Sequence, residues 1–277
     1  MKSVFVAAGV AAVSAVVTLA ASPVEQSTPR IVTDDEWCRD ASRGRDRETH
    51  CEVREFTFAT PGRLTITDSP NGAIRVTGSG RSDVQLRARV TAWARTIAEA
   101  QRIAGEVRLA VNRGTVDTAG PDGRDRDTGW SVSYRAETPR AIDLELDTSN
   151  GSIAVSDVGG TLDLSTSNGS LTLAGLSGRV EASTSNGSAR VTLSGREWTG
   201  DGLDVSTGNG SVRVDVPDGY NARLVASTGN GSLRTDIPLS VTGRLGRSID
   251  TTLGSGGSTV RLRSGNGSVR IGRAGSN

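Results

Sequence analysis

The chain has 277 residues, enough for one or two domains with a hydrophobic core, and its formal net charge is +1. So small a net charge gives no overall field that would attract nucleic acid. Aromatic residues make up 3% of the chain, and His50 is its only histidine, so a Ser-His-Asp type of active site is not expected.

The first element in chain order is an apolar N-terminal segment. Lys2 is followed by 18 residues rich in alanine and valine, Val4 to Ala21, and then by Ser22-Pro23. A charged start, an apolar middle and small residues at the end are typical of a secretory signal peptide. We therefore expect residues 1–21 to be a signal peptide and the protein to be exported to the periplasm, the cell surface or the medium. An uncleaved membrane anchor is the alternative; no membrane span is expected in the mature chain.

Residues 22–55 are predicted to be a polar leader with a disulfide-closed segment. Cys38 and Cys51 are the only cysteines, and an even pair in an exported chain favours a disulfide, here closing a loop of 14 residues counting both ends. A thiol nucleophile or metal ligand beside His50 is the alternative, but no further cysteine or histidine could complete such a site. We predict no metal site and no cofactor.

From Phe56 onward, alternating apolar residues predict β-strands, which one helix interrupts. Between Val84 and Ala92 the alternation is strict, as in a half-buried strand. Thr96 with Glu99 then forms a capping box, and apolar residues follow at helical spacing. We expect one inserted helix at about 97–107, packed on one side or end of the strands.

The strongest pattern is the tripeptide Asn-Gly-Ser, which occurs six times at intervals of 18, 18, 23, 21 and 36 residues. Apolar residues keep fixed offsets on both sides of it, which indicates a repeat protein whose units stack on one another. The last interval is twice 18 and predicts one degenerate repeat, between Asp236 and Thr259, that keeps its place in the stack. The predicted turn residues are Asn71, Gly72, Asn150, Gly151, Asn168, Gly169, Asn186, Gly187, Asn209, Gly210, Asn230, Gly231, Asn266 and Gly267.

Two architectures explain these repeats. Each Asn-Gly could close a tight hairpin in an antiparallel β-meander or sandwich. It could instead form a corner of a single-stranded β-helix, or solenoid, because Asn tolerates a left-handed backbone and Gly needs no side-chain space. The doubled interval favours the solenoid, since a rung can lose its turn residues and keep its place. We predict an all-β solenoid over residues 56–277, with rungs of about 18–23 residues.

An ordered set of landmarks adds a resemblance. They are Trp37-Cys38, Cys51-Glu-Val-Arg-Glu, the turn at Asn71, the helix, Trp130-Ser-Val-Ser-Tyr134 with Pro139, the Thr-Ser-Asn-Gly-Ser units, Trp198-Thr-Gly, Pro217 with Tyr220, and Gly254-Ser-Gly-Gly257. From about Phe56 to Arg273 the chain resembles the bacterial putative-adhesin family of β-strand-repeat proteins, a domain of unknown function. The resemblance implies a β-helix-like fold in exported proteins and brings no catalytic residues.

Two rows of charge are predicted on the outside of the repeats. The acidic row is Glu145, Asp163, Glu181 and Asp204; the basic row is Arg75, Arg190, Arg213, Arg234 and Arg270. They would form a divalent-cation strip or a glycan-binding face, or simply a solvated surface on which each sign partly balances the other. A threonine column two residues before each Asn points inward and predicts a row of corner hydrogen bonds.

These observations favour a non-catalytic, exported structural or interaction module, adhesin-like, that presents flat β faces to an envelope, surface or glycan partner. One alternative is a self-assembling cell-envelope scaffold, since no cap is evident after Ile271. The other is a carbohydrate-binding or carbohydrate-active β-helix protein, for which Asp122, Asp125 and Asp127 are the candidate acids in the loop from Ala119 to Gly129.

Overall fold

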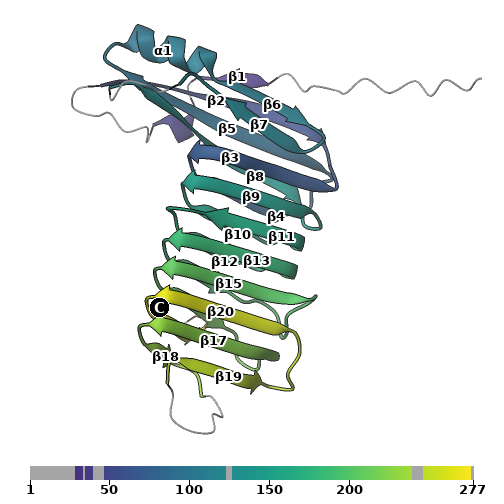
Figure 1. Ribbon diagram of the computed structural model, residues 1–277. Coiled ribbons are helices and arrows are strands. Elements are labelled where there is room, and N and C mark those ends of the chain that lie inside the picture. Colours follow the sequence, from purple (N-terminus) through teal and green to yellow (C-terminus); the bar gives the residue numbers. More distant parts are fainter. Residues whose placement is uncertain (1–28, 34, 40–46, 123–126, 239–245, 276–277) are drawn as a thin grey trace, which may run out of the picture.

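The computed structural model describes residues 29–33, 35–39, 47–122, 127–238 and 246–275. Its strands form an elongated stack of rungs with a helix-bearing cap at one end (Figure 1). The predicted signal peptide, residues 1–21, lies outside the described residues. Within the described ranges, no helix is long and apolar enough to cross a membrane.

The elements ahead of the repeats build the cap and the first rungs. They are β1 (Arg30–Val32), the 3-10 helix η1 (Glu36–Cys38), β2 (Glu48–Ala59), β3 (Arg63–Asn71), β4 (Ile74–Ser79), β5 (Asp83–Ala94), α1 (Ile97–Glu106), β6 (Arg108–Asn112), β7 (Thr115–Ala119) and β8 (Gly129–Pro139). β2 crosses the domain boundary expected at residue 56 and pairs antiparallel with β5 along its whole length.

The repeats supply the remaining strands in pairs. They are β9 (Asp143–Asn150), β10 (Ile153–Ser156), β11 (Gly159–Thr166), β12 (Leu171–Ala174), β13 (Ser177–Asn186), β14 (Ala189–Thr192), β15 (Gly202–Asn209), β16 (Val212–Val216), β17 (Ala222–Asn230), β18 (Leu233–Thr235), β19 (Ser248–Leu253), β20 (Thr259–Asn266) and β21 (Val269–Arg273).

Each repeat places one strand in each of two sheets. β9 ends at Asn150, and β10 begins at Ile153 in the other sheet, where it pairs in parallel with β4 and β12. The two strands flanking an Asn-Gly-Ser corner therefore do not pair with each other. This register confirms the solenoid and excludes the hairpin meander. We call the sheet that contains β4, β10 and β12 sheet A and the sheet that contains β9, β11 and β13 sheet B.

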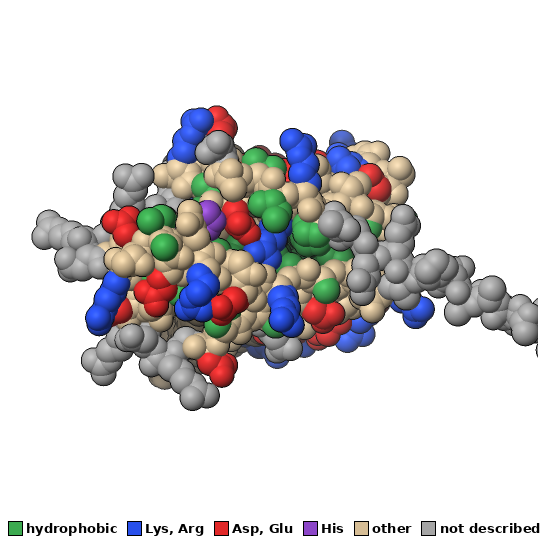
Figure 2. Space-filling model, turned by 90° about the horizontal axis from the view of Figure 1, so that it is seen from above, with side chains coloured by type: hydrophobic (Ala, Val, Ile, Leu, Met, Phe, Trp, Pro, Cys, Tyr) green, Lys and Arg blue, Asp and Glu red, His purple; other side chains and the backbone are tan. Residues whose placement is uncertain are grey.

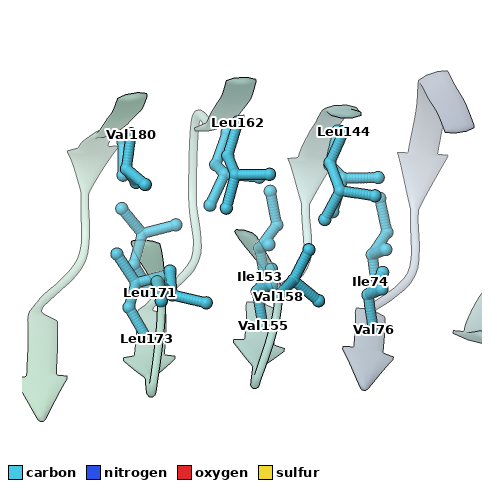
Figure 3. Packing of buried hydrophobic residues seen from close by; sticks show 14 of the residues in the cluster. Ile74, Val76, Leu144, Ile153, Val155, Val158, Leu162, Leu171, Leu173 and Val180 are labelled. Carbon is cyan, nitrogen blue, oxygen red and sulfur yellow. The ribbon is translucent and has the colours of Figure 1, made fainter. Parts of the chain in front are cut away.

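The core is a set of aliphatic rows between the two sheets. In sheet B, Leu144, Leu162 and Val180 occupy equivalent positions on neighbouring strands. Figure 3 shows them pointing toward the row from sheet A that includes Ile153 and Leu171. All five side chains are at most 1% exposed. Alternation of apolar and polar residues along each strand thus fills a dry interior and leaves both outer faces polar.

The helix closes the cap as predicted. α1 begins after Thr96, whose side chain accepts a hydrogen bond from the Glu99 backbone at 3.3 Å. Its other end is held by Arg54 of β2, which lies buried and donates to the backbone oxygens of Ala104 (2.8 Å) and Val107. A cation at a helix C-terminus satisfies carbonyls that have no partner within the helix.

At both ends the order of rungs in space differs from their order in the sequence. β7 and β8 stack on one side of β3 and β4, while β9 and β10 stack on the other side. At the C-terminal end, β20 lies between β15 and β17, and β21 lies between β16 and β18. The last repeat is therefore inserted between two earlier ones, as the yellow strand in Figure 1 shows.

Two expectations about this end are wrong. The degenerate repeat expected between Asp236 and Thr259 is not found inside the stack, because the strand described there, β19, pairs antiparallel with β17 at the edge of sheet B. The long interval is the path the chain needs to reverse and return between two rungs. Ile271, taken to mark an uncapped end, is fully buried in the inserted rung.

Cys38 and Cys51 form the predicted disulfide, with Cα atoms 5.7 Å apart. The bond ties η1 to β2, so that Trp37 lies buried over the outer face of the cap strands. The segment before the repeats is thus part of the folded unit, because the indole ring of its Trp37 covers the guanidinium groups of Arg89 and Arg135.

We expect Cys38→Ser to lower the free energy of unfolding by about 2–3 kcal/mol, because the unfolded chain is then no longer closed into a loop of 14 residues. Urea denaturation of the variant and of the native protein measures the difference. Reducing agent should shift the native midpoint by a similar amount and leave the variant unchanged; equal midpoints for native protein and variant would contradict the prediction.

Candidate functional site

The Asn-Gly-Ser corners form one continuous row along the solenoid. In every rung except that of Asn71, the Asn Nδ2 donates to the Oδ1 of the Asn in a neighbouring rung, at 2.9–3.1 Å. In spatial order the row is Asn71, Asn150, Asn168, Asn186, Asn209, Asn266 and Asn230. These side chains are exposed, but their amides bond to one another in the stack, so the repeated tripeptide has a structural explanation.

The threonine column lies inside the same corner, as predicted. Thr166 Oγ1 donates to the carbonyl oxygen of Gly151 at 2.8 Å, and Thr184 Oγ1 donates to that of Gly169 at 2.8 Å. The column repeats this bond in the following rungs. It satisfies backbone acceptors that the strands cannot reach at the corner, so these hydroxyls are not free to act on a ligand.

The acidic row runs along the outer face of sheet B. Asp163 has Glu145 and Glu181 as its register partners, and Glu181 is in turn opposite Asp204. Arginines of the same face bind three of the four: Arg63 lies 3.5 Å from Glu145, Arg179 lies 2.6 Å from Glu181, and Arg263 lies 2.9 Å from Asp204. In the described part of the chain, no group of three or more His, Cys, Asp or Glu is arranged to hold a metal ion.

Asp163→Asn is expected to leave stability unchanged or to raise it slightly, because Asp163 lies between two like charges in register. Thermal denaturation with and without millimolar Ca²⁺ measures the effect. If Ca²⁺ raised the melting temperature of the native chain but not that of the variant, a cation bound on the acidic row would explain the result instead.

The basic row runs along the outer face of sheet A, on the opposite side of the solenoid. Arg190, Arg213, Arg270 and Arg234 follow one another in register on β14, β16, β21 and β18. The expectation that the two rows balance each other is therefore wrong. Instead, Arg213 pairs with Asp215 at 2.7 Å and Arg270 pairs with Asp236 at 2.7 Å, both within or beside sheet A.

At the cap end, the basic row continues into a cluster that sequence reasoning missed. Arg135 lies opposite both Arg87 and Arg75. The Trp37 ring contacts two guanidinium groups, that of Arg135 at 4.1 Å from the ring centroid and that of Arg89 at 4.9 Å. These residues come from β4, β5, β8 and η1, so only the register of sheet A brings them together. The strict alternation along β5 places every second side chain on its outer face, and this was the sequence pattern that could have pointed to the cluster.

Several positive charges lie close together in this cluster. Burial is the main cause that lowers the pKa of Arg135, and the charges of Arg75, Arg87 and Arg89 lower it further, while Asp35 opposes them. Asp35 and Glu55 both bind Arg87. Within the described ranges, neither Arg75 nor Arg135 has a carboxylate at salt-bridge distance.

A shallow hollow lies on the outer face of sheet B, where Gly202 of β15 has no side chain. Arg179, Glu181, Asp204 and Arg261 line it. Of the three carboxylates that line the hollow, those of Glu181 and Asp204 are paired with arginines. Asp201 alone has no salt bridge among the described residues, so the hollow offers no second unpaired acid for a general acid and base to act together.

Of the three candidate acids of the loop, the structure describes Asp122 and Asp127. Asp125 lies outside the described residues. Asp127 binds Arg95, and this hydrogen bond is the main cause that lowers its pKa. A carboxyl group with a lowered pKa stays ionised at neutral pH, which suits an ion pair and not a proton donor. Seen from the cap end, Arg and Asp or Glu side chains are interspersed on the surface (Figure 2).

Several known proteins share features with this chain. Residues 79–272 match the family model described as Toastrack DUF4097. A putative cell adhesion protein from Clostridium sporogenes has 11% identity and a TM-score of 0.47, over 80% of this chain and 99% of that one. A putative adhesin from Bacteroides fragilis has 15% identity and a TM-score of 0.30, over 82% and 98%.

A putative adhesin from Parabacteroides distasonis has 12% identity and a TM-score of 0.32, over 80% of this chain and 96% of that one. No curated protein matches the sequence. The family model covers well over half of the chain and agrees with the resemblance carried by the repeated corners. The chain therefore belongs to the Toastrack DUF4097 family.

Proposed function

We propose that the protein is a non-catalytic, exported interaction module, adhesin-like, that presents the outer faces of its two sheets to a partner at the cell envelope or surface. One observation carries the proposal: side chains of the same charge occupy equivalent positions on successive strands, as in the acidic row on sheet B and the basic row on sheet A. Such a wall repeats one contact every rung, about 4.8 Å apart.

The arrangement of the acids supports the non-catalytic part of the proposal. Glycoside hydrolysis needs two carboxyl groups facing each other across a substrate, one of them able to give up a proton. Within the described chain, Glu181 and Asp204 are bound to arginines, and the pKa of Asp127 is lowered.

Export is proposed together with this function. Residues 1–21 are proposed as a signal peptide, residues 22–55 as the leader with its disulfide, and residues 56–277 as the solenoid. A disulfide suits an oxidising compartment. N-terminal sequencing of the protein recovered from its native host tests the cleavage, and retention in the membrane fraction would favour an anchor.

A self-assembling scaffold is less well supported. End-to-end stacking that continues the parallel rungs needs parallel edge strands, but β19 and β6, the edge strands of sheet B, each run antiparallel to their neighbour. Sedimentation of the mature protein over a range of concentrations would reveal such assembly.

A glycan array and a polysaccharide hydrolysis assay, both with the purified mature protein, test the proposal. Binding to defined glycans without turnover is the expected result. Robust turnover that is lost on changing Asp122 or Asp127 to Asn would falsify the non-catalytic assignment. Changing Asp163 to Asn serves as the matched control, because it removes one acid from a different face.

A further inference from the structure

The outer face of sheet A carries one nearly continuous row of arginines along the solenoid axis. In spatial order it is Arg87 (β5), Arg135 (β8), Arg75 (β4), Ala154 (β10), Thr172 (β12), Arg190 (β14), Arg213 (β16), Arg270 (β21) and Arg234 (β18). We call it the arginine row. Its eight strand-to-strand steps span about 38 Å at about 4.8 Å each.

Four members of the row are not neutralised by the protein. Arg75, Arg135, Arg190 and Arg234 have no carboxylate at salt-bridge distance among the residues that the structure describes, whereas Arg213 and Arg270 each bind an aspartate. Like charges in register destabilise a sheet unless something compensates them. The repulsion among these arginines is therefore not compensated by the described residues. It is concentrated at two basic places, one on the cap side of Ala154 and Thr172 and one on the other side.

The two basic places are held differently. At the cap end, Trp37 packs against Arg135 and Arg89, and the disulfide fixes the segment that carries Trp37. Their guanidinium groups are therefore oriented before any ligand arrives, which lowers the entropy lost on binding. At the other place, arginines follow rung by rung, so the spacing is set by the strands themselves.

We propose that the arginine row binds a linear polyanion that lies along the solenoid axis, with its anionic groups on the two basic places and its middle over Ala154 and Thr172. The small side chains of that middle leave a flat path for the chain. This inference deepens the proposed function, on which it rests, by naming the chemical class of the ligand.

The arginine row is narrow, and this favours a polymer chain over a planar anionic surface as its ligand. Two residues beyond Arg135 and Arg213 on their strands stand Glu137 and Asp215, in the next row of the same face. Asp215 is buried and bound to Arg213, whereas Glu137 is exposed. A membrane would meet Glu137 together with the arginines, but a narrow polymer chain can follow the row and leave Glu137 to one side. Ile31 and Ile97 are the large hydrophobic residues exposed in the described structure, and both are in the cap rather than on the repeats.

Binding of long-chain polyphosphate, polygalacturonate, tripolyphosphate and phosphatidylglycerol vesicles to the mature protein tests the proposal. Polyphosphate represents phosphate polymers and polygalacturonate represents carboxylate polymers, so their comparison tells which anion the row prefers. Either long polymer should bind at low salt and weaken as salt rises. Tripolyphosphate should bind much more weakly, because it cannot reach from Arg75 to Arg190, four rungs along sheet A including both ends.

The decisive comparison uses two double variants with the same change in net charge. Arg75→Gln with Arg190→Gln removes one arginine from each basic place, and we expect polymer affinity to fall at least fivefold, since each arginine near an anionic surface contributes about fivefold. Arg223→Gln with Arg261→Gln removes two arginines from sheet B and should change affinity by less than about twofold, since general attraction is weak at this net charge.

Equal losses in the two double variants would overturn the proposal, as would vesicle binding without polymer binding. Binding to no polymer would overturn it too. In that case, recognition of a neutral glycan on the array, unaffected by the Arg75 and Arg190 changes, would leave the proposed interaction function standing. Circular dichroism of each variant separates loss of binding from loss of fold.

Discussion

Deletion of residues 259–277 is expected to unfold more than the rung that it removes. The deleted segment contains β20 and β21, which lie between β15 and β17 in sheet B and between β16 and β18 in sheet A. Without them, β17 and β18 lose their parallel partners. In a solenoid whose last repeat is at its end, the same deletion would only shorten the stack.

The size of the effect follows from what the inserted rung buries. Val260, Leu262, Val269 and Ile271 are all fully buried, and burial of each is worth about 1.5–3 kcal/mol. The sum is comparable with the whole stability of an ordinary domain, about 5–15 kcal/mol. We expect hydrogen exchange to show lost protection in β17 and β18, while β11 to β14 stay protected.

Two further measurements make this prediction decisive. Deletion of residues 275–277 keeps the backbone bond from Ala274 to Val216, so it should leave exchange unchanged and serves as the control. Addition of a peptide with residues 259–273 should restore protection to β17, because the gap between the rungs has its shape. If β17 stayed protected in the truncated chain without the peptide, that strand would have moved onto β15, and the inserted rung would not be required.

The sequence predicted the repeating unit better than the order of the units. Fixed offsets around each Asn-Gly-Ser determine which side chains face the core, so the solenoid, its corners and the inward threonines could be predicted. The order could not, because every repeat offers nearly the same aliphatic row to a neighbour: Val260 fits opposite Leu203 as well as opposite Leu224. The interval of 36 residues was compatible with both a degenerate rung and a return path.

Part of the candidate site could likewise be predicted from the sequence, and part could not. The acidic and basic rows follow from period alone, and the structure has both. Their placement on opposite faces follows from the corner at Asn186, which lies between Glu181 in sheet B and Arg190 in sheet A, since each such corner carries the chain from one sheet to the other. The cluster around Trp37 depends on pairing between strands distant in sequence, β4, β5 and β8, which no local pattern encodes.

Gly169→Ala is expected to destabilise the protein by at least about 3 kcal/mol, at the upper end of single substitutions. A Cβ at Gly169 would lie 1.9 Å from the carbonyl oxygen of Gly151 in the preceding rung. Both atoms belong to backbones fixed by strand pairing, so neither can move without displacing a rung. The left-handed conformation that turn chemistry suggests is not the cause, because Gly169 is not among the glycines with a positive φ.

Two matched glycines separate space from conformation. Gly62→Ala meets no atom within 4 Å and needs no positive φ, so we expect it to be neutral or stabilising by up to about 1 kcal/mol. Gly195→Ala also has open space but a φ of 74°, and it should cost about 1–2 kcal/mol for backbone strain alone. Urea denaturation of the three variants should rank them Gly62, Gly195, Gly169 in order of increasing loss. A loss at Gly169 no greater than at Gly195 would mean that the rungs can separate at the corner, and the stack would then be less rigid than the two rows of charge require.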